Sequence, residues 1–159
     1  MMTQNPADSE QLALTPETLG NQFRRNLETL VYTAGKNGTA LVALTTFSIH
    51  LRPGMGTDQR NAAMVTARYY MPYLSADDLL AGFERYNRII REVALKTGAL
   101  LIEQGNSIPG DPIHFNDSVH FTDAGSQKQA DRVVSALVNS RAFQKIATLK
   151  RQHTTAEES

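Results

Sequence analysis

The chain contains no cysteine, and it also lacks a net charge and any long apolar run. Without cysteine, a disulfide framework, a thiolate metal site and a cysteine nucleophile are all excluded. Sixteen basic residues balance sixteen acidic residues, so no field of either sign favours nucleic acid or an anionic membrane as a partner. No stretch approaches the roughly 18 apolar residues of a membrane span, and residues 1–14 lack the pattern of a signal peptide. Composition therefore leaves the choice between an enzyme and an interaction module open, and it does not decide localisation.

The 159 residues are 41% hydrophobic, which is enough for one domain with a sizeable core. Residues 1–14 are polar and aperiodic, and we treat them as a separate amino-terminal segment. Residues 15–147 carry the apolar periodicity of a folded domain. Residues 148–159 are polar again, and we expect them to be disordered.

Three amphipathic helices are predicted from their start signals and apolar stripes. The first begins at Thr15 and Pro16, where a side-chain oxygen can cap the helix and proline suits the first turn. The second begins at Ser75, which with Asp78 resembles a capping box. The third is capped by Thr122 and carries its apolar stripe up to residue 138. A weaker pattern indicates a further short helix within residues 59–73.

Two short, continuous apolar runs, Ala40–Leu44 and Ala99–Ile102, are typical of parallel strands that helices cover on both faces. The order of helices and strands therefore predicts an α/β fold. Thr45 and Thr46 follow the first strand, at the carboxyl end where open α/β sheets bind ligands. We predict that these two threonines contact the substrate.

Asp117 and His120 lie three residues apart in a loop between the second strand and the last helix. In ester hydrolysis by a serine, a histidine removes the serine proton through one ring nitrogen. A carboxylate accepts the other N–H, fixes the tautomer and stabilises the imidazolium. The spacing suits such a pair, although Asp-x-x-His on its own occurs often by chance.

The context of this pair resembles the carboxyl-terminal half of the SGNH (GDSL-type) hydrolases. The resemblance covers residues 15–137, and its sharpest parts are Asp-Ser-Val-His-Phe-Thr-Asp-Ala-Gly at 117–125 and Asn-Arg-Ile-Ile-Arg at 87–91. It implies a three-layer α/β/α, flavodoxin-like fold and a Ser-His-Asp triad without a cofactor. In that triad His120 is the general base and Asp117 its orienting partner. The implied substrate is a small-molecule, carbohydrate or lipid ester that is cleaved through an acyl-serine intermediate.

The sequence departs from the family in its other half. Members carry a Gly-Asp-Ser segment with the nucleophile, an oxyanion-hole glycine and a Gly-x-Asn-Asp segment, and none of these is present. Gly110-Asp111-Pro112 has proline in place of the nucleophile, and Ser48, Ser118 and Ser126 are expected to be structural. We therefore expect half a domain that is inactive alone, from a gene fragment, a truncated gene model or a split enzyme. Its partner would then be the missing amino-terminal half or a second chain.

Two alternatives remain open. His114, Asp117, His120 and Asp123 alternate at three-residue spacing and could bind zinc or another divalent ion, as in a metallohydrolase or metal-binding module. That arrangement needs a continuous helix through residues 116–118, where turn-forming residues predominate. The second alternative is a non-catalytic interaction module whose exposed apolar stripes are covered by a partner. His50 is assigned to a loop with no functional role.

Overall fold

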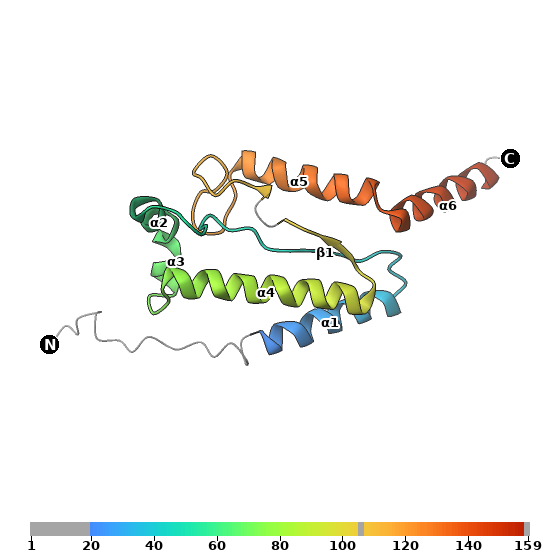
Figure 1. Ribbon diagram of the computed structural model, residues 1–159. Helices are drawn as coiled ribbons and strands as arrows, with labels where there is room; N and C mark the ends of the chain where they lie inside the picture. Colours follow the sequence, from blue (N-terminus) through green and yellow to red (C-terminus); the bar gives the residue numbers. More distant parts are fainter. Residues whose placement is uncertain (1–19, 105–106, 158–159) are drawn as a thin grey trace.

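The computed structural model describes residues 20–104 and 107–157, and it shows a mixed α/β chain dominated by helices (Figure 1). The predicted α/β class is confirmed at this level. The elements in chain order are α1 (Asn21–Lys36), β1 (Ala43–Thr45), α2 (Thr57–Ala63), α3 (Val65–Tyr70), α4 (Ala76–Thr97), β2 (Leu100–Ile102), α5 (Asp123–Val138) and α6 (Arg141–Glu157).

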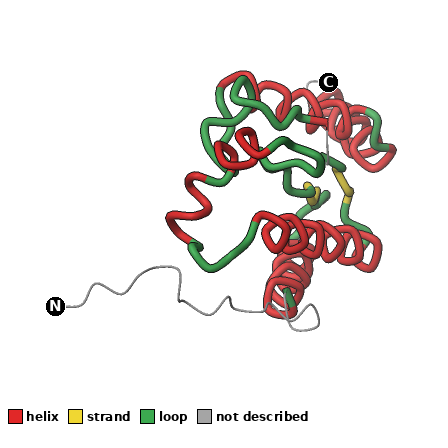
Figure 2. Tube along the Cα trace, turned by 60° about the vertical axis from the view of Figure 1, so that its left-hand side comes forward, coloured by secondary structure: helices red, strands yellow, loops and turns green. Residues whose placement is uncertain are grey.

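The sheet contains two parallel strands, with Ala43 opposite Leu100 and Thr45 opposite Ile102. It lies between α4 on one side and α5 on the other, as two views show (Figures 1 and 2). Both predicted strands are present and parallel, although β1 covers Ala43–Thr45 and the prediction was Ala40–Leu44. Their expected burial is only partly met, because Ala43 is exposed and only Ile102 is fully buried. The physical reason is the size of the sheet: among the described residues, each strand has a neighbour on one edge only.

Helix α4 begins and ends where the sequence indicates. The Ser75 hydroxyl accepts a hydrogen bond from the Asp78 amide at 3.1 Å, and the Asp78 carboxylate accepts one from the Ser75 amide at 3.2 Å. This reciprocal capping box satisfies backbone donors that the first turn of a helix leaves free. Gly98 ends the helix with a left-handed φ of 75°, a conformation that glycine adopts without steric cost.

Helix α1 packs along α4 through an apolar cluster that joins Val31 to Ile89 and Val93. Within the described chain α1 begins at Asn21, after Gly20 with its positive φ of 87°. The predicted start at Thr15 and Pro16 lies outside the described residues. The short helix predicted within 59–73 is found as two helices, α2 and α3.

A second apolar cluster anchors the segment after β1. Ile49 and Leu51 are buried against Ala63, Met64 and Ala67 of the α2–α3 region, together with Leu79 of α4. This cluster fixes the backbone on both sides of residue 50. It thereby supports the loop that carries the candidate site.

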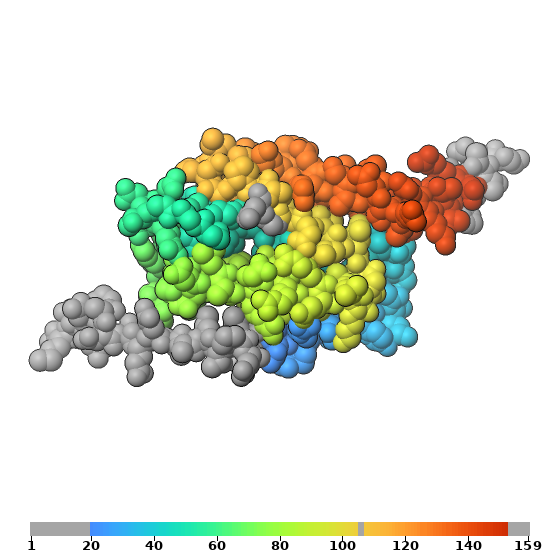
Figure 3. Space-filling view, in the orientation of Figure 1, coloured from blue at the N-terminus to red at the C-terminus, as the bar shows by residue number. Residues whose placement is uncertain are grey.

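The carboxyl-terminal region differs from the prediction. The sequence predicts a disordered tail over residues 148–159, but residues 148–157 continue helix α6, which begins after Ser140, and residues 158–159 lie outside the described chain. The Ser140 carbonyl accepts the Gln144 amide at 2.9 Å, and most residues that follow have high helix propensity. Helical propensity does not require an apolar stripe, so the polar composition did not exclude a helix. Figure 3 shows α6 extending beyond the rest of the described chain.

Candidate active site

The loop between β2 and α5 ends in a hairpin that carries Asp117 and His120 at its tip. Phe115 and Phe121 form an antiparallel bridge, and the Asn116 amide donates to the His120 carbonyl at 2.8 Å. Thr122 then caps α5 by accepting the Gly125 amide at 3.2 Å, as predicted. The hairpin therefore connects directly to a capped helix, which limits its freedom to move.

Asp117 makes an Asx-type turn that brings its carboxylate to the histidine ring. Its Oδ1 accepts the backbone amides of Val119 and His120, each at 2.8 Å. Its Oδ2 lies 2.8 Å from Nδ1 of His120. The Asp-x-x-His spacing produces this geometry locally, because Asp side chains readily bond the amides two and three residues ahead.

The same contacts keep Asp117 ionised. Partial burial alone would raise the pKa of this carboxyl, but the amides of His120 and Val119 and the His120 ring lower its pKa to about 2. At neutral pH the carboxylate is therefore an acceptor, and Nδ1 of His120 is held as the N–H donor.

The side chain of His120 is 74% exposed, whereas that of Asp117 is 23% exposed. Within the described chain, the only hydrogen bond of the His120 ring is the one from Nδ1 to Asp117. Nε2 is therefore available to a group that approaches from solvent or from another chain. This arrangement can act as a general base whose orientation is already fixed.

Within the described residues, the serines considered as nucleophiles lie in places where their roles are structural. Ser118 is 3% exposed, and its hydroxyl donates to a carbonyl of α2 at 2.7 Å and accepts an amide of α3 at 3.1 Å. The Ser48 hydroxyl accepts Arg52 at 3.2 Å. Ser126 lies within α5. None of these hydroxyls is hydrogen-bonded to His120.

A second Asp-x-x-His pair, which the sequence reasoning missed, lies six residues earlier in the same loop. Oδ1 of Asp111 is 2.7 Å from Nδ1 of His114 and accepts the Ile113 and His114 amides at 3.0 and 3.1 Å. The His114 side chain is only 11% exposed. The repeated spacing was visible in the sequence and could have revealed this pair. Its burial makes it a support of the loop rather than an accessible base.

Three of the four residues of the metal alternative, His114, Asp117 and His120, are divided between these two pairs, and the fourth, Asp123, lies in the first turn of α5. Asp117 holds His120, while His114 turns to Asp111 instead. Over residues 20–104 and 107–152, no three His, Asp or Glu side chains gather as they would around a metal ion. The region of 116–118 is a hairpin turn, so the continuous helix that the alternative needs does not form.

Thr45 and Thr46 lie at the carboxyl end of β1, beside a cavity of about 410 Å³. The cavity is lined by Thr45, Thr46, Phe47, Ser48, Phe83, Val119, Phe121 and Gln129. Val119 and Phe121 come from the hairpin on either side of His120, whereas His120 itself is not among the lining residues. The substrate contact predicted for Thr45 stays a prediction.

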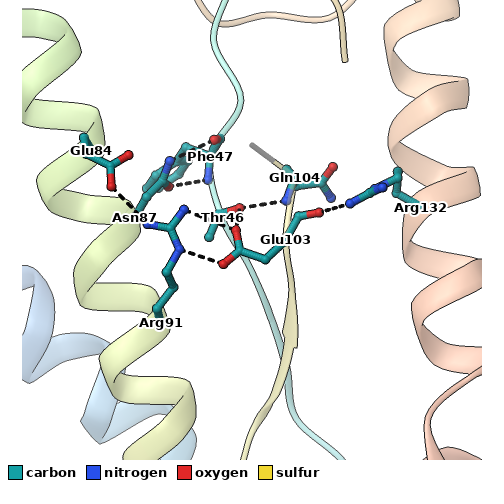
Figure 4. A network of polar contacts seen from close by, with 8 residues as sticks. All are labelled: Thr46, Phe47, Glu84, Asn87, Arg91, Glu103, Gln104 and Arg132. Carbon is teal, nitrogen blue, oxygen red and sulfur yellow. Dashed lines mark hydrogen bonds and ion pairs between the residues drawn. The ribbon is translucent and has the colours of Figure 1, made fainter. Parts of the chain in front are cut away.

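The Thr46 side chain is committed to the structure rather than free for a ligand. It is 2% exposed, and its hydroxyl accepts the Gln104 amide at 2.8 Å and donates to Glu103 at 3.3 Å. Glu103 in turn pairs with Arg91 of α4 at 2.6 Å, and its carbonyl accepts Arg132 of α5 (Figure 4). The network ties α4 and α5 to the carboxyl ends of both strands.

Asn87 of α4, also drawn in Figure 4, holds the chain just after β1. Its side chain accepts the Phe47 amide at 2.6 Å and donates to the Phe47 carbonyl at 3.1 Å. Both bonds fix the direction in which the segment leaves the sheet. The sequence alone marked Asn87 only as part of the helix motif.

No family model, curated protein or solved structure matches this chain. A proposal for the function therefore depends on the geometry of the site. Among the described residues, no helix combines the length and apolar character of a membrane span.

Proposed function

We propose that this chain supplies the general base and its orienting carboxylate to an SGNH-type ester hydrolase with a three-layer α/β/α fold. The observation that carries the proposal is the geometry of Asp117 and His120. An ionised carboxylate lies 2.8 Å from Nδ1, and the His120 ring is largely exposed. This combination suits a histidine that must accept a proton from a nucleophile at its other nitrogen.

In the proposed reaction, Nε2 of His120 takes the proton of a serine hydroxyl as that oxygen attacks the ester carbonyl. Asp117 stabilises the imidazolium through the Nδ1–H bond. The imidazolium then gives its proton to the departing alcohol, which leaves an acyl-serine. His120 next removes a proton from water, the hydroxide attacks the acyl group, and the serine oxygen regains its proton from His120.

In this scheme the serine belongs to a polypeptide segment outside the described residues. We place that segment at the edge of β1 that does not pair with β2. Ala43 is exposed in the middle of an apolar run, which is unusual for a parallel strand. A strand that pairs in parallel with this edge would end beside Thr45. A serine at its carboxyl end would then lie near the cavity that Val119 and Phe121 line.

The direct test is reconstitution of the full chain with a polypeptide that carries a Gly-Asp-Ser segment, taken first from a neighbouring reading frame. Hydrolysis of p-nitrophenyl acetate and labelling of the serine by a fluorophosphonate are the two readouts. His120→Ala should abolish turnover, and Asp117→Ala should reduce it by roughly a thousandfold or more. Asp111→Asn alters the other Asp-x-x-His pair and serves as the matched control.

Unchanged turnover in the His120→Ala complex would sink the assignment. The metal alternative makes a different prediction, since a chelator and changes at His114 would then impair activity as much as changes at His120. Stoichiometric zinc in the purified chain would favour that alternative.

A non-catalytic interaction module is the second candidate, and exposed apolar side chains favour it. Leu95 is 88% exposed, Tyr69 80% and Tyr70 73%. Such groups are typical of surfaces that bind a partner when they form a patch. A stable complex with a partner that shows neither ester hydrolysis nor fluorophosphonate labelling would support this candidate.

A further inference from the structure

His50 lies in the segment after β1, 67 residues before Asp117, and the sequence assigned it no role. In the structure His50 is only 6% exposed. Buried histidines generally have hydrogen-bond partners, and the partners of His50 belong to the candidate active site.

Three contacts join His50 to the hairpin. Its backbone amide donates to the Ser118 carbonyl at 3.0 Å, and its Nδ1 lies 3.2 Å from the Asp117 carbonyl. Its ring stacks on Phe115 with 5.6 Å between centroids and 7° between planes. Because a carbonyl oxygen only accepts, Nδ1 of His50 must carry a proton.

The His50 backbone is itself firmly placed. Ile49 and Leu51 on either side are buried in the cluster with α2, α3 and α4. On the loop side, Gly110 approaches so closely that a Cβ there would lie 2.4 Å from the His50 carbonyl oxygen. The His50 imidazole is therefore a hydrogen-bond donor whose position is set by the buried cluster and does not depend on the conformation of the hairpin.

Asp117 lies next to a second anchored residue. The Ser118 hydroxyl bonds a carbonyl of α2 and an amide of α3, while the Ser118 carbonyl accepts the His50 amide. The carbonyls of the two consecutive residues Asp117 and Ser118 are thus both held by His50. The direction of the Asp117 side chain follows from the orientation of this backbone.

We propose that His50 is a positioning residue for the candidate base: by holding the Asp117 and Ser118 carbonyls, it fixes the direction in which Asp117 presents its carboxylate to His120. Its significance for catalysis rests on the proposed function. The geometric part concerns the loop alone, so it can be tested on the full chain without a nucleophile.

Two substitutions separate the hydrogen bond from the ring. His50→Phe keeps a ring to stack on Phe115 and removes the donor. His50→Asn removes the ring but places an amide N–H near the position of Nδ1. NMR of the labelled chain should report the pKa of the Asp117 carboxyl and the exchange rate of the His120 amide, with amides in the middle of α4 as the control for folding.

In His50→Phe, we expect the pKa of Asp117 to rise toward its ordinary value. The His120 amide should exchange roughly tenfold faster, which corresponds to the loss of about one hydrogen bond. His50→Asn should stay close to the parent chain in both measurements. Unchanged values in His50→Phe, or equal changes in both variants, would overturn the proposal.

A measurement on the unaltered chain covers the case in which a variant does not fold. The ¹⁵N shifts of His50 should show a protonated Nδ1, and a neutral ring protonated only at Nε2 would contradict the inference. In a reconstituted hydrolase, His50→Phe should lower kcat with little change in KM. If no hydrolase activity exists, the proposed function fails while the NMR results still decide the role of His50 in the loop.

Discussion

Replacement of Asp117 by asparagine removes the negative charge of the candidate site and keeps the turn that the Asp117 side chain forms with the backbone. The asparagine carbonyl can still accept the amides of Val119 and His120, so the hairpin should keep its shape. The acceptor for Nδ1–H of His120 is lost, because the other atom of the new side chain is a donor. The substitution therefore removes the charge and the tautomer control with little change in volume.

The magnitude follows from the pKa of Asp117. The structure lowers it from an ordinary 3.8 to about 2. Each tenfold change in proton affinity corresponds to about 1.4 kcal/mol, so the ionised form gains at most about 2.5 kcal/mol from folding. Solvent screens this part-exposed carboxylate, and we expect about 1 to 2 kcal/mol.

The sign sets the pH range of the effect. Because the folded state lowers the pKa, the carboxylate stabilises the fold fully above about pH 5, and this contribution is lost as the pH falls through 4 toward 2. In urea denaturation at pH 7, the free energy of unfolding of Asp117→Asn should be about 1 to 2 kcal/mol lower than that of the parent. The difference should shrink steadily at lower pH.

A ¹³C titration of the Asp117 carboxyl in the parent chain measures the same quantity directly. A midpoint at or above 3.8, or an unfolding difference that does not change with pH, would refute the reasoning. Asp131→Asn, at an exposed position of α5, is the matched control and should change the free energy of unfolding by less than about 0.5 kcal/mol.

Three further substitutions test the packing that supports the site, each by urea denaturation at neutral pH. Gly125→Ala should destabilise by about 1 to 3 kcal/mol, since a Cβ would lie 2.1 Å from a backbone carbonyl oxygen of the preceding loop. Gly35→Ala meets nothing within 4 Å and lies in a helix, so it should instead stabilise slightly, and equal losses would argue against the contact. Ser118→Ala leaves two buried backbone groups without their partner and should cost about 1 to 3 kcal/mol, whereas Ser135→Ala on the surface of α5 should cost almost nothing. Ser75→Ala should cost about 1 kcal/mol through loss of the α4 cap, and an unchanged stability would show that the cap is not needed.

The candidate pair could be predicted from the sequence because its geometry is local. Asp117 reaches Val119 and His120 through bonds that span two or three residues, and the capping box of Ser75 and the Thr122 cap span the same distance. Such bonds depend on residue type and spacing, and both are visible in the sequence. The two parallel strands were predictable from a different signal, since the continuous hydrophobicity of a short run reports the environment of a strand.

The contacts of His50 could not be predicted in this way. They join residues 65 to 68 positions apart, and they exist only because one buried cluster places the segment after β1 against the hairpin. The same holds for the exposure of Ala43, which depends on how many strands lie side by side. Polar composition likewise did not reveal helix α6.

Taken by itself, the sequence determined helices α4 and α5, their caps and the turn in which a carboxylate faces an imidazole, because hydrogen bonds between near neighbours need no other part of the chain. Only the tertiary structure decided which histidine is exposed and which is buried, and that His50 braces the backbone of Asp117. Those outcomes depend on how segments that are far apart in the sequence pack together, and the pattern of neighbouring residues does not report that packing.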